Sequence, residues 1–95
     1  MLPSCTDPAW SMLLALLAAE ASSERPSVSE LCAVSGAPLT TAFRLLLRME
    51  DRRMVARTPD PHDHRRSLVA LSDPTRTALT DALGSLGDAL LRHDD

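Results

Sequence analysis

The sequence predicts a mainly α-helical domain with one small β-hairpin, an α+β fold. Four segments show the apolar spacing or the capping residues that are typical of helices, and two short segments rich in β-forming residues flank a polar loop. The 95 residues provide one small hydrophobic core, which excludes a large enzyme with a second domain. We therefore expect a single domain over residues 1–95.

The first helix is expected at residues 8–21, after an N-terminal tail at residues 1–7. Asp7 is a good N-cap and Pro8 suits the first helical position. Apolar residues then recur on one face of a helix, at Trp10, Leu13, Leu14, Leu17 and Ala18. The apolar run around them has 13 residues, whereas a helix that crosses a membrane needs about 20. We interpret it as a core helix and expect no membrane partner.

A helix-turn-helix pattern follows the first helix. Ser27 and Glu30 have the spacing of a capping box, which predicts a second helix at residues 27–35. Gly36 favours the left-handed conformation that ends a helix, and Pro38 is tolerated in the first turn of the next one. Two helices joined by a short turn that contains glycine are typical of a helix-turn-helix unit.

The third helix, expected at residues 38–53, has an apolar and a polar face when it is plotted at about 100° per residue. We expect the apolar face to be buried, and it consists of Leu39, Ala42, Phe43, Leu46 and Met49. The polar face carries Thr40, Thr41, Arg44, Arg48 and Arg52. Leu45 and Leu47 make the apolar arc broad, which favours a contact with a partner or a second copy.

A β-hairpin is expected at residues 54–71. Its strands are residues 54–57 and 67–71, and the nine residues 58–66 between them are rich in Asp, Pro and His. A last helix is expected at residues 73–92, with an apolar stripe at Leu79, Leu83, Leu86 and Leu90. The element order helix-helix-helix-strand-wing-strand-helix is that of a winged helix-turn-helix domain.

Positive charge is concentrated in one part of the chain. All ten basic residues are Arg, and 13 acidic residues give a formal net charge of −3. Seven of the ten Arg lie within residues 44–66 with four acidic residues, so this segment carries +3 and each flank carries −3. A basic segment in an otherwise acidic domain is typical of a face that binds a polyanion. The alternative is that these Arg only solvate a helix and a turn.

The segment of residues 60–72, Asp-Pro-His-Asp-His-Arg-Arg-Ser-Leu-Val-Ala-Leu-Ser, resembles the wing of MarR-type transcriptional regulators. The signature of that wing is D-x-R, five residues, then L-T. It is matched here by Asp63, Arg65 and Leu71, with Ser72 in place of Thr. Upstream matches to the family's helix-turn-helix and first wing strand are Glu30-Leu31, Gly36, Thr40-Thr41, Arg44, Met49-Glu50 and Met54-Val55 through Arg57. The resemblance covers about residues 9–83.

The resemblance implies a transcriptional regulator that binds double-stranded DNA in a sequence-specific manner. It assigns the third helix to the major groove, with Thr40, Thr41, Arg44 and Arg48 as the contacting residues. It assigns Arg65 to the minor groove, with Arg66 beside it and Asp63 orienting the wing through an ion pair. Arg is favoured in narrow, strongly negative minor grooves. The alternative for Asp63 and Arg65 is a surface ion pair that stabilises the loop.

The sequence departs from the family pattern in three respects, one of which is the broad apolar arc that Phe43, Leu45 and Leu47 give the third helix. The family commonly has Gly between the third helix and the first wing strand, where this chain has Arg53, a costly residue if the backbone there is left-handed. The family also dimerises through longer terminal helices, so we expect a short form. One winged helix binds DNA modestly, and we therefore expect a homodimer. Its contacts would involve Leu83, Leu86 and Leu90, with or without Trp10.

Other chemistry has little support in the sequence. His62, Asp63 and His64 form one cluster, whereas zinc needs four convergent ligands, so we expect no metal and no cofactor. No nucleophile has an evident base beside it, and we expect no catalytic residue and no enzyme. Cys5 and Cys32 do not form a disulfide framework, and the cytoplasm is the expected compartment. Cys32 is interpreted as a buried thiol, and nothing in the sequence supports a small-molecule effector.

A second functional hypothesis stays open. A winged helix can serve as a protein-protein interaction module, or as the cofactor of a regulator, without binding DNA itself. The acidic flanks and the margin formed by Leu45 and Leu47 favour this hypothesis, whereas the Arg on the third helix and in the wing favour DNA.

Overall fold

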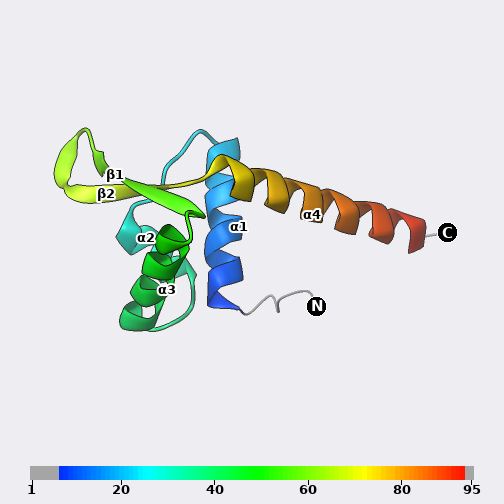
Figure 1. Cartoon of the computed structure of the whole chain (residues 1–95), viewed down its shortest axis with the longest axis horizontal. Helices are drawn as coiled ribbons and strands as arrows, with labels where there is room; N and C mark the ends of the chain where they lie inside the picture. The colour runs from blue at the N-terminus through cyan, green and yellow to red at the C-terminus, as the bar shows by residue number, and fades with distance from the viewer. Residues whose placement is uncertain (1–6, 94–95) are drawn as a thin grey trace.

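The computed structural model describes residues 7–93, with side chains described up to residue 85. The elements in chain order are α1 (Pro8–Ala21), α2 (Val28–Val34), α3 (Leu39–Asp51), β1 (Val55–Asp60), β2 (Asp63–Leu71) and α4 (Asp73–His93). This order confirms the predicted winged helix-turn-helix and its α+β class (Figure 1).

Local capping interactions determine where the first helices begin. The Asp7 side chain accepts hydrogen bonds from the backbone amides of Ala9 (2.9 Å) and Trp10 (3.4 Å) at the start of α1. Both bonds of the capping box are present at α2, from the Glu30 amide to the Ser27 hydroxyl (3.2 Å) and from the Ser27 amide to the Glu30 carboxylate (3.1 Å). Four backbone amides at the starts of α1 and α2, which have no carbonyl partner within the helix, thus donate hydrogen bonds to nearby side chains.

The helices differ slightly from the ranges expected for them. The second helix is shorter than residues 27–35, because Ser27 and Ser35 are its caps. The third helix is shorter than residues 38–53, because Pro38 is its N-cap and Arg52 its C-cap. The last helix ends at His93, one residue later than expected. Residues 1–6 of the expected tail lie outside the described residues.

The end of α3 has the hydrogen bonds of a Schellman motif. The Met54 amide donates to the Met49 carbonyl (2.8 Å), and the Arg53 amide donates to the Glu50 carbonyl (3.0 Å). Arg53 has a φ of 60°, so a residue with a β-carbon occupies the left-handed position that favours glycine. Arg53 therefore takes the place of the glycine that the family commonly has here, at the cost of backbone strain.

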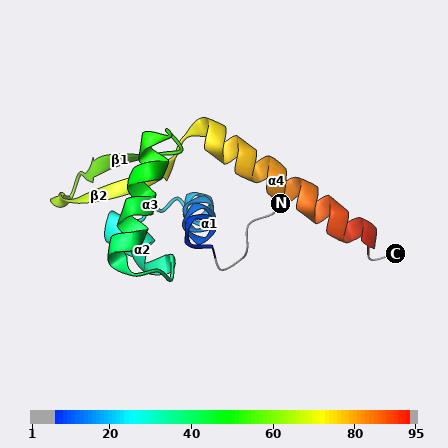
Figure 2. The same cartoon turned by 60° about the horizontal axis from the view of Figure 1, so that its bottom comes forward.

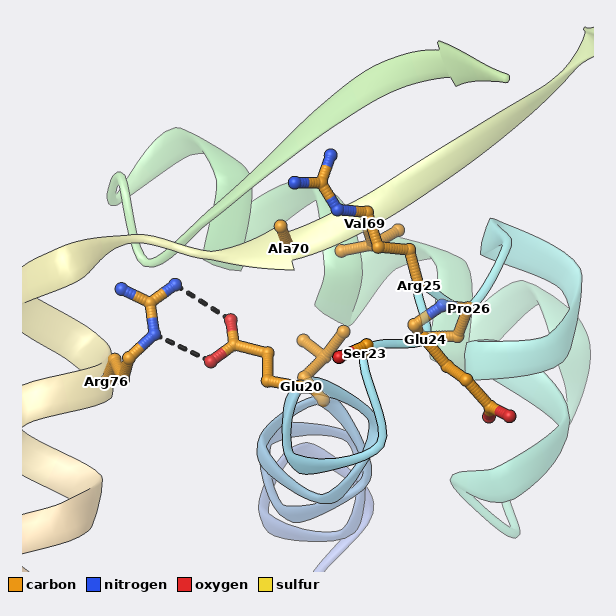
Figure 3. A pocket seen from close by; sticks show the side chains of 9 residues that line it. Glu20, Ser23, Glu24, Arg25, Pro26, Val69, Ala70 and Arg76 are labelled. Carbon is orange, nitrogen blue, oxygen red and sulfur yellow. Dashed lines mark hydrogen bonds and ion pairs between the residues drawn. The ribbon is translucent and has the colours of Figure 1, made fainter. Parts of the chain in front are cut away.

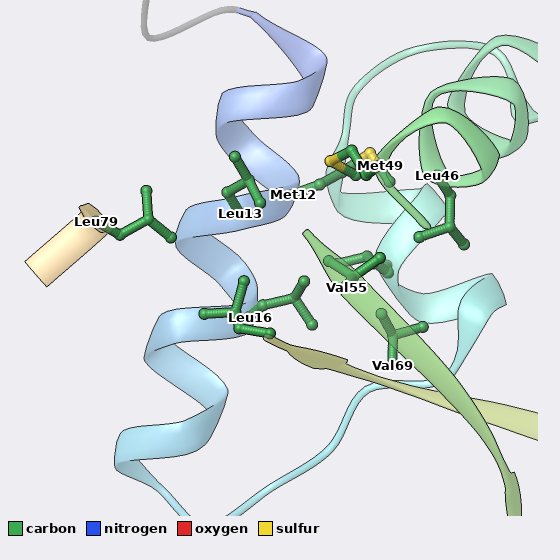
Figure 4. Packing of buried hydrophobic residues seen from close by; sticks show 10 residues of the cluster. Met12, Leu13, Leu16, Leu46, Met49, Val55, Val69 and Leu79 are labelled. Carbon is green, nitrogen blue, oxygen red and sulfur yellow. The ribbon is translucent and has the colours of Figure 1, made fainter. Parts of the chain in front are cut away.

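The hydrophobic core lies where α1, α2, α3 and the base of the hairpin meet. Met12, Leu13 and Leu16 of α1 belong to this core, and Figure 4 shows Met12 beside Met49 and Leu13 on the side of α1 that faces Leu79. The buried residues contributed by the other elements are Leu31, Cys32, Ala42, Leu46, Met49, Val55, Val69, Leu71 and Leu79. The core thus joins the helix-turn-helix to the base of the wing.

The expected buried face of the third helix is wrong at two positions. Ala42, Leu46 and Met49 are buried, but Leu39 is 69% exposed and Phe43 is 38% exposed. The face that meets the core is centred on Ala42, Leu46 and Met49, and Leu45 also packs against the core, so this face is turned about the helix axis away from Leu39 and Phe43. Leu39 and Phe43 therefore lie outside the core.

The hairpin is longer, and its connection shorter, than the sequence predicts. β1 and β2 pair antiparallel from Val55 with Leu71 to Pro59 with Ser67, and an irregularity follows at Asp60. Only residues 61–62 connect the strands, in place of the nine-residue loop expected at residues 58–66. The Asp60 side chain accepts a hydrogen bond from the His62 amide (2.8 Å) and closes the turn.

The wing is also bonded to the helix-turn-helix through the backbone. The Val69 amide of β2 donates to the Pro26 carbonyl (2.9 Å), and Ser27 forms an isolated antiparallel bridge with Leu68. These contacts attach the base of the wing to the segment that leads into α2. Figure 2 shows α4 extending away from this unit, whereas α3 and the hairpin lie together at its other end.

Candidate nucleic-acid interface

The outer face of α3 carries the residues that the sequence predicts for a major-groove contact. Thr40, Thr41, Arg44 and Arg48 are all exposed. The only acidic residues of this helix, Glu50 and Asp51, are in its last turn. Within the described side chains, no carboxylate lies within ion-pair distance of Arg44 or Arg48. The charge of both guanidinium groups is therefore not neutralised by this part of the molecule.

An apolar strip lies beside this polar face. We use the term for Leu39, Phe43 and Leu47, which are 69%, 38% and 39% exposed. They follow one another at intervals of four residues, so they lie on successive turns of one side of α3. The sequence predicts a broad apolar arc on this helix, with Leu39 and Phe43 in the core. The structure instead presents them to solvent next to Thr40 and Arg44.

Asp63 and Arg65 form an ion pair at the start of β2, directly after the turn of the wing. The Arg65 Nε lies 3.3 Å from the Asp63 Oδ1, and the same oxygen accepts the Arg65 backbone amide at 3.1 Å. The Arg65 side chain is nevertheless 92% exposed, so the carboxylate contacts the backbone amide and the Nε of Arg65 while most of the side chain faces solvent. Such an exposed pair contributes little to stability.

Arg66 makes a contact that the sequence analysis missed. Its Nη2 lies 2.8 Å from the Glu30 Oε1 of α2, across 36 residues of sequence. Hydrogen bonds from the Ser27 backbone and hydroxyl, and then the charge of Arg66, hold the pKa of Glu30 below its usual value. Glu30 therefore caps α2 and ties the wing to it, and Arg66 shares its charge with this carboxylate.

A second ion pair ties the wing to α3. The Arg57 Nε lies 3.0 Å from one carboxylate oxygen of Glu50, and its Nη2 lies 3.0 Å from the other. The hydrogen bonds to Glu50 raise the pKa of Arg57 above its already high value. This two-bond geometry fixes the orientation of the guanidinium plane. Together with the pair between Arg66 and Glu30, it holds both strands of the wing against the helix-turn-helix.

An open cleft of about 480 Å³ lies between the wing and the start of α2. Arg57, Arg65 and Arg66 line its wing side, and Ser29 and Glu30 line its helical side. Each of these three Arg has a carboxylate partner, whereas Arg44 and Arg48 have none among the side chains that the structure describes. The cleft is therefore lined by Arg side chains whose positive charges are balanced by carboxylates of the same chain.

A third ion pair attaches α4 to α1. The Arg76 Nε lies 2.6 Å from the Glu20 Oε2, and its Nη2 lies 2.8 Å from the Glu20 Oε1 and 3.1 Å from the Leu71 carbonyl (Figure 3). Asp73 is a further partner of the same guanidinium. Glu20 and Arg76, with Arg25 and Ala70, border an open pocket of about 340 Å³. The hydrogen bond from Arg76 is the main cause that lowers the pKa of Glu20.

The residues expected at a dimer contact are only partly described. Trp10 is half-buried and packs against the core of its own chain, and Leu83 is also half-buried. Leu79, which begins the expected stripe, is buried in the core. The side chains of Leu86 and Leu90 lie outside the described ones.

Metal and membrane sites have no support in the described residues. No group of three or more His, Cys, Asp or Glu among them is arranged to hold a metal ion. Cys32 is buried, and its burial raises the pKa of the thiol. No described helix is by itself long and apolar enough to cross a membrane, and only α2 with α3, bent by 113°, passes such a test as a pair.

Similar folds occur in transcriptional regulators of known structure. The chain aligns with the S. aureus MepR-DNA complex at 19% identity and a TM-score of 0.77, over 93% of this chain and 68% of that one. It aligns with the transcriptional regulator PA4135 at 19% identity and a TM-score of 0.73, over 90% and 60%. A probable transcriptional regulator from Pseudomonas aeruginosa aligns at 24% identity and a TM-score of 0.67, over 83% and 57%.

At these identities the structural matches establish the fold. The chain spans about 60% of the length of PA4135 and of MepR in its DNA-binding conformation. A search of curated proteins gives no significant match. The model of the MarR family matches residues 6–66, which include the helix-turn-helix and most of the wing. The chain therefore belongs to the MarR family, whose members are transcriptional regulators.

Proposed function

We propose that this chain binds double-stranded DNA in a sequence-specific manner and acts as a transcriptional regulator. α3 enters the major groove with Thr40, Thr41, Arg44 and Arg48, and the wing places Arg65 in the adjacent minor groove. The observation that carries the proposal is the exposure of Arg44 and Arg48 on α3 without a described carboxylate partner. The MepR complex contains DNA, which supports a DNA-binding role for this fold.

The chemistry of α3 suits the edges of base pairs. A guanidinium can bind the O6 and N7 atoms of guanine with two hydrogen bonds, and a Thr side chain can contact a phosphate or a thymine methyl. The N-terminal residues of a recognition helix make most of its base contacts, and Thr40, Thr41 and Arg44 are in the first turns of α3.

The wing suits a contact outside the major groove. Figure 1 shows the hairpin extending beyond the helices on the side where α3 lies, away from α4. Arg65 is almost fully exposed just after the turn, and Asp63 contacts both its backbone amide and its Nε. The negative potential of a narrow minor groove favours an Arg held in this way. Arg66 lies beside it and would exchange its contact with Glu30 for a phosphate.

The proposed assembly is a homodimer in the cytoplasm. A single winged helix buries little surface on DNA, and two copies on a palindromic site give the affinity and specificity that regulation needs. The contacts proposed for the dimer are Leu83, Leu86 and Leu90, with or without Trp10. Static light scattering tests the assembly, because a monomeric mass at high micromolar concentration would contradict it.

A salt series tests the central proposal. Fluorescence anisotropy with a labelled random-sequence duplex should show binding at low salt that weakens as salt is added, because Arg contacts release counterions from the phosphates. The variant Arg44→Ala/Arg48→Ala should bind more weakly and with a smaller salt dependence. An absence of salt-dependent binding by the unmodified protein would contradict the DNA-binding function.

A second candidate function is a protein-protein interaction module that does not itself bind DNA. The exposed apolar strip favours this function, because large apolar side chains on a surface are typical of contacts with proteins. The same salt series distinguishes the two candidates, since an interaction module of this kind would leave the duplex unbound at every salt concentration.

A further inference from the structure

We infer that Leu39 and Phe43 contact thymine methyl groups in the major groove and give the protein a preference for A·T pairs beside the bases that Arg44 reads. The inference rests on the proposed function and deepens it, because it names a specificity that composition and charge do not indicate. The starting observation is that two large apolar side chains stay exposed on the helix proposed to read DNA.

The two residues are neighbours of the predicted base-reading residues on the surface of α3. Phe43 is three residues after Thr40, and Leu39 is five residues before Arg44, so all four lie in the first two turns. Residues three and four apart on a helix lie side by side, which joins Leu39 to Phe43 and Phe43 to Thr40. The apolar strip and the polar face therefore form one continuous surface at the N-terminal end of α3.

The major groove offers one apolar group, the C5 methyl of thymine, and Phe and other apolar side chains contact it in protein-DNA complexes. When α3 presents Thr40 and Arg44 to base edges, Leu39 and Phe43 face the neighbouring edges of the same groove. A cytosine or a purine at these positions would place polar atoms of its major-groove edge next to Leu39 and Phe43. A thymine would bury both its methyl and the side chain, which lowers the free energy of the complex.

Charge favours DNA over a second copy of the chain as the occupant of this surface. A symmetric dimer through the apolar strip would place the same patch of both copies face to face. Arg44 and Arg48, which have no carboxylate partner among the described side chains, would then approach their counterparts and repel them. The negative charge of DNA would instead attract these two Arg.

The test is a thymine-to-uracil scan, because uracil pairs like thymine and lacks only the methyl. Duplexes enriched by the unmodified protein from a random library are resynthesised with deoxyuridine in place of each thymidine in turn. At one or two positions the affinity should fall about fourfold, the value expected for one buried methyl. In Phe43→Ala or Leu39→Ala the same uracil should have no effect.

Val34→Ala is the matched control. Val34 is a large apolar residue of α2 that is 53% exposed but lies outside α3, so this variant should keep the full uracil effect. A flat scan, or an effect that persists in both α3 variants, would overturn the inference while DNA binding stands. If no duplex is enriched, the proposed function fails and the inference with it. A change in the oligomeric mass of Phe43→Ala would assign the apolar strip to self-association instead.

Discussion

Arg76 of α4 holds Glu20 of α1 through two hydrogen bonds, one from Nε at 2.6 Å and one from Nη2 at 2.8 Å, although 56 residues separate them. The same guanidinium also donates to the Leu71 carbonyl at the end of β2. One side chain therefore joins the first helix, the hairpin and the last helix. Both partners are partly exposed, so solvent weakens the pair but does not remove it.

Removing the charge of Glu20 should lower stability only where that carboxylate is ionised. The pKa of Glu20 is lowered in the folded protein, so its stabilising contribution is complete above the ordinary value of 4.5 and is lost as the pH falls below it. Glu20→Gln should therefore unfold at a lower temperature than the unmodified protein at neutral pH. The two melting temperatures should converge in acid, measured by circular dichroism across pH. A constant difference at every pH would contradict this origin of the stability.

Arg53→Gly should stabilise the protein. Arg53 adopts a φ of 60°, a conformation that costs a residue with a β-carbon about 1 to 2 kcal/mol and costs glycine almost nothing. The free energy of unfolding in urea should rise by about 0.5 to 1 kcal/mol, after the larger chain entropy of unfolded glycine is subtracted. Arg52→Gly is the control, because Arg52 has a φ of −86° and should lose stability. Arg53→Ala keeps the β-carbon and should show no gain.

Glu30→Gln should strengthen DNA binding. The amide oxygen of Gln can still accept the Ser27 backbone amide, so the cap of α2 is kept while the ion pair with Arg66 is lost. The released Arg66 gains a phosphate contact, and the slope of log affinity against log salt should steepen by up to about 0.9. Glu24→Gln changes the net charge equally at an exposed loop residue and should alter the slope less. Equal effects of both variants would assign the change to net charge alone.

Arg44 and Arg65 should contribute to DNA binding in different ways. Arg44→Lys keeps the charge but loses the planar, two-bond contact with a base, so affinity for enriched duplexes should fall by about 1 to 3 kcal/mol while affinity for random duplexes changes little. Arg65→Ala should weaken binding to both kinds of duplex and reduce the salt dependence. Anisotropy titrations on both duplexes measure these effects. Loss of the same size on random DNA for Arg44→Lys would exclude a base-reading role.

The order of elements could be predicted because its signals are local. Asp7 and the capping box of Ser27 with Glu30 are recognisable within four residues, and the structure contains their hydrogen bonds. The outer part of the hairpin, residues 56–59 and 64–66, is exposed and carries no apolar alternation, so its strands were expected to be shorter than β1 and β2 are. Its two-residue turn depends on Asp60, whose role is visible only once the strands are paired.

The candidate site was predictable in composition but not in contacts. The helical wheel separates Thr40, Thr41, Arg44 and Arg48 from the core, yet it cannot show which part of a broad apolar arc meets the other helices. Leu39 and Phe43 were therefore assigned to the wrong side. The partners of Arg66 and Arg76 lie 36 and 56 residues away in sequence. Such pairs are produced by packing and leave no local pattern.

Because α4 is long, a small change in its angle near Arg76 moves its far end by several ångströms. Its 21 residues extend for about 30 Å at 1.5 Å per residue, and its attachment to the domain is near its beginning. A rotation of about 10° at that attachment displaces the far end by about 5 Å on the same arithmetic. One base pair of duplex DNA occupies about 3.4 Å along its axis. In a dimer joined through α4, the angle of this attachment, made by Arg76 and by the burial of Leu79, would thus set the separation of the two half-sites to within about one or two base pairs.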